Sequence, residues 1–567
     1  MDISKALHNL TALAFVTMFV SGCGSDTTTV TPIPSPPEVN ENLAVFADGS
    51  EFIFEKDVRI QMRDGITLSA NVFRPNSDGT YPVIMAMTPY NKDWLDVEYE
   101  ESDGHINVSE FATFEQADPA FWVPNGYVVI AVDNRGMNLS EGDMAILNDQ
   151  EAQDYYDAIE WAGVQAWSNG NVGLNGVSYM AMNQWKVAEL APPHLKAFMP
   201  WEGLTDLYRD FAYHGGIGGN SFLQGWWMFR ILENKHPNAA EQNLFNQVQQ
   251  TPFFDAFYEH HSPSNLSSIN IPAYVVASWP DHGLHTRGTL AGFEQIQSPY
   301  KWLEIHGRKK WEWYYSDEAK LRQLSFFNHF LADNDKSIME QPSVTYELRS
   351  AYYEGETKYA ENWPLSLGYE TVLYLNAINN QLSESMPSSP SKSEYNTDTD
   401  TDTVSESERV VFSHTFSNDT EITGGMKAVL WISLEGAQDT DIFVGIQKHD
   451  INGEVVHFFG NDIENGQVAN GWLRASHREQ DLNRSSFLTP YHLHQQAQPI
   501  LEDDIVEVEI EILPSSTLFR AGERLSIVIQ GTDIEESGLE HESISQGKVI
   551  IHTSEQYPSR LQLQQFF

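Results

Sequence analysis

The chain has 567 residues, of which 41% are hydrophobic and 12% aromatic, so it holds enough apolar material for several buried cores. Its 80 acidic residues outnumber the 33 basic ones, which gives a formal net charge of −47 at pH 7. Because a surface of this charge repels nucleic acid and anionic lipid headgroups, we expect neither as a binding partner.

Residues 1–22 predict a lipoprotein signal peptide. An apolar run lies between Lys5 and Cys23, and it is too short to indicate a membrane span. The sequence VSGC at 20–23 resembles a bacterial lipobox, whose cysteine is acylated and becomes the mature N-terminus. Cys23 is the only cysteine, so no intramolecular disulfide can form.

We therefore expect an exported protein that acyl chains on Cys23 attach to a membrane of the bacterial cell envelope. Gly24 follows the cysteine, and this resembles the pattern of outer-membrane rather than inner-membrane sorting. The Ser-, Thr- and Pro-rich sequence within residues 23–48 predicts a flexible tether. The alternative is an ordinary signal peptide with a coincidental cysteine.

Residues 49–335 predict an α/β domain. Alternating apolar positions at 58–62 and 66–73 predict an antiparallel pair of strands joined by a tight turn. Continuous apolar runs such as 82–87 and 127–133 are typical of strands buried on both faces of a parallel sheet. Helical patterns separate the later strands, and this alternation predicts a doubly wound sheet. The helices are expected at 151–162 and 180–190, and further strands at 197–200, 273–279 and 302–305.

The alternation of strands and helices is interrupted once and later ends, and each change predicts a further structural unit. Residues 201–270 are aromatic and Gly-rich, and we expect them to form a helical cap inserted over the sheet. Residues 340–567 contain short strand-like runs separated by turn signals, which predict a β-sandwich. A calcium-binding loop that starts at Asp398 in the tract at 396–407 needs Gly and Glu at the two positions where the chain has Thr403 and Arg409, so we expect a solvated loop. The expected strands of the sandwich lie at 372–375, 410–416, 428–434, 506–513 and 525–531.

The segment 171–185, NVGLNGVSYMAMNQW, carries the main chemical signal. A strand runs into Gly176-Val177-Ser178 and then directly into a helix, which is the arrangement of a nucleophile elbow. Such a turn exposes the Ser178 hydroxyl at the top of a parallel sheet. It also places the backbone N–H of Tyr179 at a helix N-terminus, where it can stabilise an oxyanion.

The sequence also resembles the cocaine-esterase/Xaa-Pro dipeptidyl-peptidase family of serine hydrolases, which includes α-amino acid ester hydrolases and cephalosporin acylases. The resemblance covers about residues 50–535 and implies an α/β-hydrolase domain, an inserted cap and a C-terminal jelly-roll sandwich. One departure is Ala181, because the family pattern Gly-x-Ser-Tyr-x-Gly ends in glycine. The matching blocks are MRDGITLSANVFRP (62–75), MTPYNK (87–92), VDNRGMNLSEGD (132–143), 151–180 and TGGMKAVLWISLEGAQDTDIFVGI (423–446).

The acid and base that activate the serine follow it in the chain in this fold. Asp281 stands in Trp-Pro-Asp, which resembles the family's Trp-x-Asp motif, and the alternative is an aspartate that caps the following helix. His306 follows the next strand, where the fold places its base. The common Gly-Pro-Trp-x-His block is absent, but a minority pattern with His-Gly before Lys-Trp resembles residues 306–311. His282 and His285 remain alternatives on the loop or helix after Asp281.

Further positions concern the substrate and cofactors. Tyr90 matches the family tyrosine whose hydroxyl completes the oxyanion hole, and the alternative is an aromatic side chain packed in a turn. Glu202, Asp206 and Asp210 are candidates for a carboxylate rim that binds a substrate ammonium group. We expect no metal and no organic cofactor, because the paired histidines lack metal-ligand spacing and no nucleotide-binding fingerprint is present. The paired histidines are at 260–261 and at 492 and 494.

These observations predict a serine hydrolase that cleaves an ester or amide bond through an acyl-enzyme. Ser178, His306 and Asp281 form the expected triad, and Tyr90 and Tyr179 the expected oxyanion hole. The expected substrate is a small ester or amide or a peptide, with acyl esterase and Xaa-Pro dipeptidyl-peptidase activities both open. The alternative is a non-catalytic surface binding lipoprotein on a retired hydrolase scaffold.

Overall fold

The computed structural model describes residues 42–95, 106–397, 404–460, 463–534, 540–544 and 546–567. Cys23 and the signal peptide lie outside these residues, as do most of the tether and part of the tract at 396–407. Within the described residues, no helix is both long enough and apolar enough to cross a membrane.

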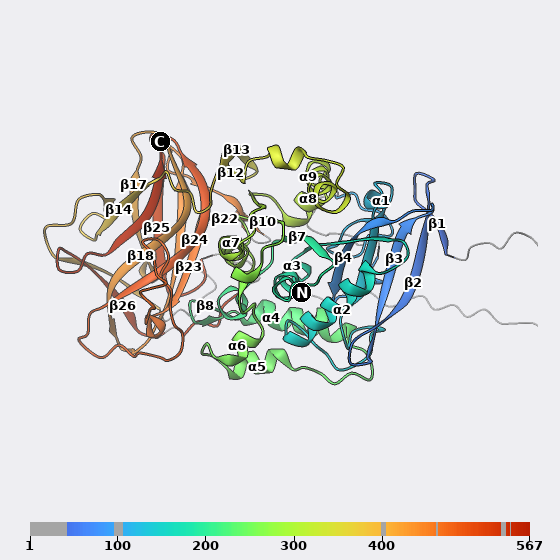
Figure 1. Ribbon diagram of the computed structural model, residues 1–567. Coiled ribbons are helices and arrows are strands. Elements are labelled where there is room, and N and C mark those ends of the chain that lie inside the picture. The colour runs from blue at the N-terminus through green and yellow to red at the C-terminus, as the bar shows by residue number, and fades with distance from the viewer. Residues whose placement is uncertain (1–41, 96–105, 398–403, 461–462, 535–539, 545) are drawn as a thin grey trace, which may run out of the picture. The chain divides into compact units, whose positions relative to one another are not determined.

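The first part of the chain forms a doubly wound sheet with an antiparallel edge (Figure 1). Gly65, at φ +89°, makes the turn between the first two long strands, and both strands lie where the sequence predicted them. From β5 onward the neighbouring strands run parallel, and their central residues are buried on both faces. In spatial order the strands are β1 (Leu43–Val45), β2 (Glu51–Gln61), β3 (Thr67–Pro75), β5 (Val128–Asp133), β4 (Tyr81–Thr88), β6 (Ser168–Val177), β7 (Leu195–Trp201), β10 (Ala273–Ser278), β11 (Lys301–His306) and β12 (Val344–Ala351).

Helices cover both faces of this sheet, as the alternation of strands and helices predicted. One face packs against α2 (Asp149–Gly163), α3 (Tyr179–Glu189) and α7 (Thr286–Gln295) in a common apolar core. The other face packs against α1 (Pro119–Trp122), α8 (Lys310–Tyr314) and α9 (Asp317–Phe327). The carboxyl ends of the parallel strands are therefore left to form a site, as in other open α/β sheets.

The segment 201–270 is more irregular than the predicted helical cap. It contains three short α-helices, two single π-helical turns, two short 3-10 helices and a small hairpin. Its aromatic side chains pack around Tyr90 and Tyr179, so this segment shares one apolar core with the strand ends beneath it. Its elements are the π-helical turn Tyr208–Ala212, β8 (Tyr213–His214), β9 (Ile217–Gly218), α4 (Asn220–Trp226), the π-helical turn Trp227–Ile231, the 3-10 helix Leu232–Asn234, α5 (Leu244–Gln250), α6 (Ala256–His260) and the 3-10 helix Leu266–Ser268.

Residues 369–567, called the C-terminal β domain below, form mainly antiparallel strands around a separate apolar core, whereas β12 extends the first sheet. The long strand β18 (Thr420–Glu435) pairs with β24 (Val506–Phe519), β26 (Lys548–Thr553) and β27 (Arg560–Phe566). The core is lined by alternate residues of these strands, as expected for a pleated layer with one buried face. The other main strands of this domain are β14 (Tyr369–Asn376), β16 (Ser391–Asn396), β17 (Arg409–Thr415), β19 (Asp441–His449), β23 (Ala469–Arg474) and β25 (Arg524–Gln530), whereas β13 (Glu354–Ala360) pairs with β12.

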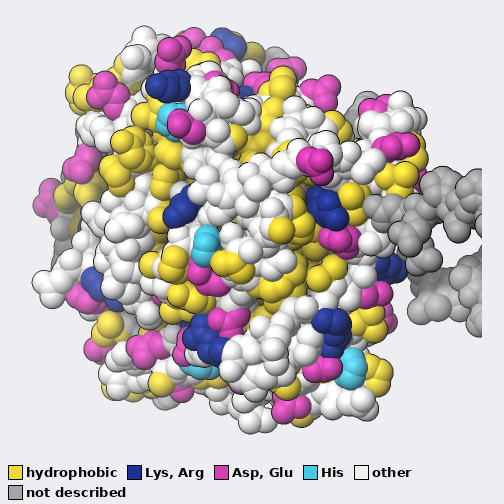
Figure 2. All heavy atoms as spheres, turned by 45° about the vertical axis from the view of Figure 1, so that its right-hand side comes forward, with side chains coloured by type: hydrophobic (Ala, Val, Ile, Leu, Met, Phe, Trp, Pro, Cys, Tyr) yellow, Lys and Arg dark blue, Asp and Glu magenta, His cyan; other side chains and the backbone are white. Residues whose placement is uncertain are grey.

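Acidic side chains are scattered over the face shown in Figure 2 and alternate there with basic and apolar ones. On this face the acidic side chains are therefore not gathered into one patch.

Candidate active site

Ser178 lies in the tight turn between β6 and α3. β6 ends at Val177, α3 begins at Tyr179, and Ser178 itself has φ +57° and ψ −117°. A non-glycine residue in this region is strained, and such strain is characteristic of a nucleophile elbow. Gly176 permits the turn, because a Cβ atom there would lie 2.5 Å from the Cβ atom of Met180. The elbow that the sequence predicted is therefore formed.

Ala181, which stands where the family pattern has glycine, packs against Gly203 in the loop that follows β7. A Cβ atom at Gly203 would lie 2.9 Å from the Cβ atom of Ala181. The absent side chain of Gly203 makes room for the methyl group of Ala181, so the elbow keeps its close packing.

His285 is the histidine that contacts Ser178. Its Nε2 atom lies 3.1 Å from Ser178 Oγ, and its Nδ1 atom donates to the carboxylate of Asp281. A hydrogen on Nδ1 leaves Nε2 as the acceptor for the serine proton. The ring is fully buried. Asp281 and His285 lie on one helical turn between β10 and α7, in which the amides of His285 and Thr286 both donate to the Asp281 carbonyl at 3.0 Å.

The prediction that His306 is the base is wrong. His306 ends β11, and its Nε2 atom lies 3.0 Å from Oε1 of Glu202 rather than at Ser178. Ser278 donates to the other oxygen of Glu202 at 2.5 Å, so this carboxylate and His306 form a separate buried cluster.

The physical reason for the difference is the spacing of Asp281 and His285. Residues four apart on a helical turn lie on the same side of it, so His285 reaches Asp281 without a contribution from the loop after β11. The i,i+4 spacing of these two residues was the one signal in the sequence that could have identified His285.

The ammonium group of Lys310 also lies near the carboxylate of Asp281. Its Nζ atom lies 3.6 Å from Oδ2 of Asp281. Burial alone would raise the pKa of the Asp281 carboxyl, but the neighbouring His285 and Lys310 hold that pKa well below its ordinary value. Asp281 is therefore ionised whenever the site operates near neutral pH.

Tyr90 and Tyr179, the residues expected to form the oxyanion hole, pack against each other. The Tyr90 ring is buried and meets the Tyr179 ring edge to face, with centroids 5.8 Å apart. The hydroxyl of Tyr90 accepts a hydrogen bond from Trp226 Nε1 at 2.9 Å, so its own proton remains available for donation. Burial raises the pKa of Tyr90 well above its ordinary value, which keeps this hydroxyl protonated.

The backbone amide and the side-chain hydroxyl of Tyr179 have different hydrogen-bonding environments. As the first residue of α3, it has an amide among the helix N–H groups that lack an intrahelical partner. Its hydroxyl donates to Glu151 Oε1 at 2.8 Å, away from the serine, and Asn134 donates to the same oxygen at 2.6 Å. Burial raises the pKa of Glu151 to about 7. This buried cluster holds the start of α3 in place.

The proposed carboxylate rim is not formed by the residues that the sequence indicated. Glu202 contacts His306, Asp206 pairs with Arg209 at 2.7 Å, and Asp210 pairs with Arg287 at 2.8 Å. Each carboxylate is thus engaged by a side chain of the same chain. Within the part of the chain that is described, no group of three or more His, Cys, Asp and Glu side chains is arranged to hold a metal ion.

Glu115 is a buried acid near the site that sequence reasoning missed. Its carbonyl accepts from the Val177 amide at 3.0 Å, beside the elbow, and its carboxylate accepts from Trp311 Nε1 at 2.8 Å. Burial raises its pKa to about 7, against the opposing effect of Lys310. It lies in an irregular segment without a motif, so the sequence offered no signal for it.

Comparison with known proteins agrees with this architecture. Residues 64–309 match the model of the X-Pro dipeptidyl-peptidase (S15) family, and residues 336–562 match the X-Pro dipeptidyl-peptidase C-terminal non-catalytic domain. A crystal structure of a CocE/NonD family hydrolase from Staphylococcus aureus is 42% identical, with a TM-score of 0.87, over 93% of this chain and 96% of that one.

Two more distant proteins are also similar to this chain. Cocaine esterase from Rhodococcus sp. (strain MB1 Bresler) is 25% identical over 84% of this chain and 90% of that protein. The structure of an α-amino acid ester hydrolase, 16% identical, shares the fold with a TM-score of 0.70 over 94% of this chain and all of that one. The chain therefore belongs to the CocE/NonD family of hydrolases, and its two domains match the X-Pro dipeptidyl-peptidase models.

Proposed function

We propose that this chain hydrolyses carboxylic esters through an acyl-enzyme formed on Ser178, with His285 as general base and Asp281 as its orienting acid. The observation that carries the proposal is the continuous contact from Ser178 Oγ to His285 Nε2 and from His285 Nδ1 to Asp281. A serine hydroxyl is a weak nucleophile, and a neighbouring base that is itself oriented activates it.

The proposed reaction has two halves. In the first, Ser178 Oγ attacks the ester carbonyl carbon, His285 Nε2 takes the serine proton, and then returns it to the leaving alkoxide as the C–O bond breaks. In the second, water attacks the acyl-enzyme, His285 takes a proton from the water, and that proton returns to Ser178 Oγ as the acid departs. The negative charge on the carbonyl oxygen is stabilised by the Tyr90 hydroxyl and the Tyr179 amide.

We favour an ester with an uncharged acyl group over a peptide with a free N-terminus. Recognition of an ammonium group needs an available carboxylate. Glu202, Asp206 and Asp210 are engaged by His306, Arg209 and Arg287. The retired-scaffold alternative is not favoured, because a serine, a histidine and an acid are all present and in contact.

Three further features belong to this proposal. The mature protein is anchored to the cell envelope through an acylated Cys23, with the outer membrane as the expected location. The C-terminal β domain has a jelly-roll topology. The lipobox-like sequence VSGC and the succession of short antiparallel strands support these two features, respectively. The substrate is a small molecule rather than a macromolecule.

Fluorophosphonate labelling of the purified chain tests the mechanism. Wild type, Ser178→Ala, His285→Ala and His306→Ala are compared, with p-nitrophenyl acetate and Gly-Pro-p-nitroanilide as substrates. We expect labelling to be lost in Ser178→Ala, strongly slowed in His285→Ala and retained in His306→Ala. Preferred turnover of the ester supports the substrate assignment, and preferred turnover of the dipeptide overturns it. A folded wild type that takes no label would overturn the proposed chemistry.

A further inference from the structure

The turn that carries Asp281 and His285 is in contact with the C-terminal β domain. His282, next to Asp281, donates from its Nε2 atom to the backbone carbonyl of Pro514 in β24 at 3.0 Å. The His282 ring is buried, and burial lowers its pKa to about 4, so it is neutral near pH 7. The hydrogen bond therefore attaches this turn to β24 without adding a charge.

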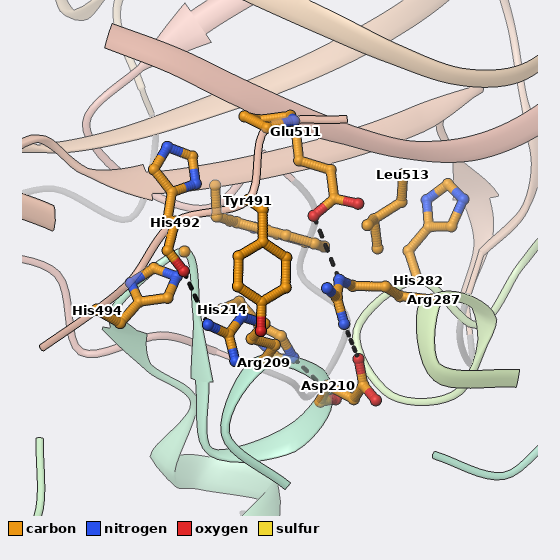
Figure 3. Close-up of a pocket in the computed structure, with 13 residues that line it drawn as sticks. Arg209, Asp210, His214, His282, Arg287, Tyr491, His492, His494, Glu511 and Leu513 are labelled. Atoms are coloured by element: carbon orange, nitrogen blue, oxygen red, sulfur yellow. Dashed lines mark hydrogen bonds and ion pairs between the residues drawn. The ribbon is translucent and has the colours of Figure 1, made fainter. Parts of the chain in front are cut away.

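A second contact lies at the other end of the same turn. Arg287, two residues after His285, donates from Nε to Glu511 Oε2 at 3.2 Å and from Nη1 to Asp210 Oδ1 at 2.8 Å. Figure 3 shows the guanidinium group of Arg287 between these two carboxylates. Glu511 belongs to β24, and Asp210 belongs to the segment above the sheet. Arg287 thus joins three parts of the molecule at the start of α7.

The segment that contains Asp210 also contacts the C-terminal β domain and α7. Arg209, beside Asp210, donates to the carbonyl of His492 at 2.8 Å and stacks over Tyr491, so this segment is attached to the C-terminal β domain as well. A Cβ atom at Gly288 would lie 2.3 Å from Asp210 Oδ2, which shows how closely α7 approaches it.

The space between these side chains is small. The cavity among Arg209, Arg287, His492 and Glu511 measures about 30 Å³, enough for a water molecule but not for a substrate (Figure 3). The turn has little room to shift while its contacts persist.

We propose that Glu511 and Arg287 are positioning residues through which the C-terminal β domain holds His285 at Ser178. The inference rests on the proposed function, in which His285 is the base. Because His285 comes from the start of α7 rather than from the loop after β11, its position depends on what holds α7. On the side of the C-terminal β domain, Glu511 and the Pro514 carbonyl supply those contacts.

The test is Glu511→Gln, which keeps the volume of the side chain and removes its charge. A small displacement of a catalytic group costs up to about 100-fold in rate, so we expect kcat for p-nitrophenyl acetate to fall about 10- to 100-fold. KM should change little, because substrate binding is not altered. Glu511→Asp keeps a carboxylate and should recover part of the lost kcat.

Glu509→Gln is the matched control. Glu509 lies two residues earlier on the same strand, and it pairs with Lys427 at 2.7 Å, away from α7. Both variants lose one ion pair of β24, so a general effect on the C-terminal β domain would appear in both. We expect only Glu511→Gln to lower kcat. Equal kcat values in the two variants would overturn the inference.

A second measurement separates positioning from general damage to the fold. If Glu511 acts through His285, then Glu511→Gln should add no further loss to the residual activity of His285→Ala. A full additional loss in the double variant would overturn the inference even if the proposed function holds. If His285→Ala itself keeps full activity, the proposed function fails first, and the inference fails with it.

Discussion

The Oγ atom of Ser178 and the Nε2 atom of His285 lie 3.1 Å apart, although the two residues are separated by 107 positions in the chain. Ser178 is held by the elbow between β6 and α3, and His285 by the single turn that precedes α7. The contact therefore depends on the relative placement of two strand ends, those of β6 and β10, which are separated by β7 in the sheet.

His306→Asn should leave hydrolysis nearly unchanged and lower the stability of the fold. The substitution removes the contact of Glu202 with an imidazole, and Glu202 is only 1% exposed. Removing the partner of a buried polar group costs about 1 to 3 kcal/mol, which urea unfolding would measure. The double variant Glu202→Gln, His306→Asn is the control and should recover part of this free energy. Loss of ester hydrolysis in a folded His306→Asn would contradict our assignment of His285.

Tyr90→Phe should lower kcat for ester hydrolysis by about 100- to 1,000-fold, because it removes one of the two proposed donors to the oxyanion. Steady-state kinetics with p-nitrophenyl acetate measure the change. Trp226→Phe is the control: it removes the donor to the Tyr90 hydroxyl but leaves the Tyr90 proton in place, so its effect should be much smaller. A change confined to KM in Tyr90→Phe would argue that Tyr90 contacts the substrate without stabilising the oxyanion.

Gly203→Ala should destabilise the fold by about 1 to 3 kcal/mol through overpacking against Ala181. The new Cβ atom would lie 2.9 Å from that of Ala181, closer than two carbon atoms can approach. Ala181→Gly in the same chain should restore part of the loss, as measured by urea unfolding. Gly225→Ala, where a Cβ atom meets nothing within 4 Å, is the control for adding a methyl group. Equal costs for the two single alanine substitutions would show that the packing explanation is incorrect.

Glu115→Gln should make the stability of the chain less dependent on pH. An unfolded glutamate titrates at about pH 4.3, whereas burial raises the pKa of Glu115 to about 7. Between these values the folded chain binds more protons than the unfolded chain, so the free energy of unfolding falls as pH rises.

The wild type should therefore lose about 3 kcal/mol more than Glu115→Gln on going from about pH 4 to about pH 8. Urea unfolding at a series of pH values measures this difference. Glu110→Gln, at an exposed position of the same segment, is the matched control and should behave as the wild type does. Parallel pH profiles for all three proteins would mean that Glu115 does not retain a proton in the fold.

The sequence alone determined the sheet and its elbow. The apolar runs at 82–87 and 127–133 became β4 and β5, and the Gly176-Val177-Ser178 turn became the connection between β6 and α3. These features are local: burial on both faces requires continuous apolar residues, and the sharp turn requires glycine where a Cβ atom would collide.

Only the tertiary structure decided which histidine meets the serine and which carboxylates are available. His285 and His306 are both buried, and their different partners, Ser178 and Glu202, follow from how the ends of β6, β7, β10 and β11 are placed side by side. The same holds for the pairing of Ala181 with Gly203 and of Arg287 with Glu511. These contacts join positions far apart in the chain, and no local pattern of residues encodes such a distance.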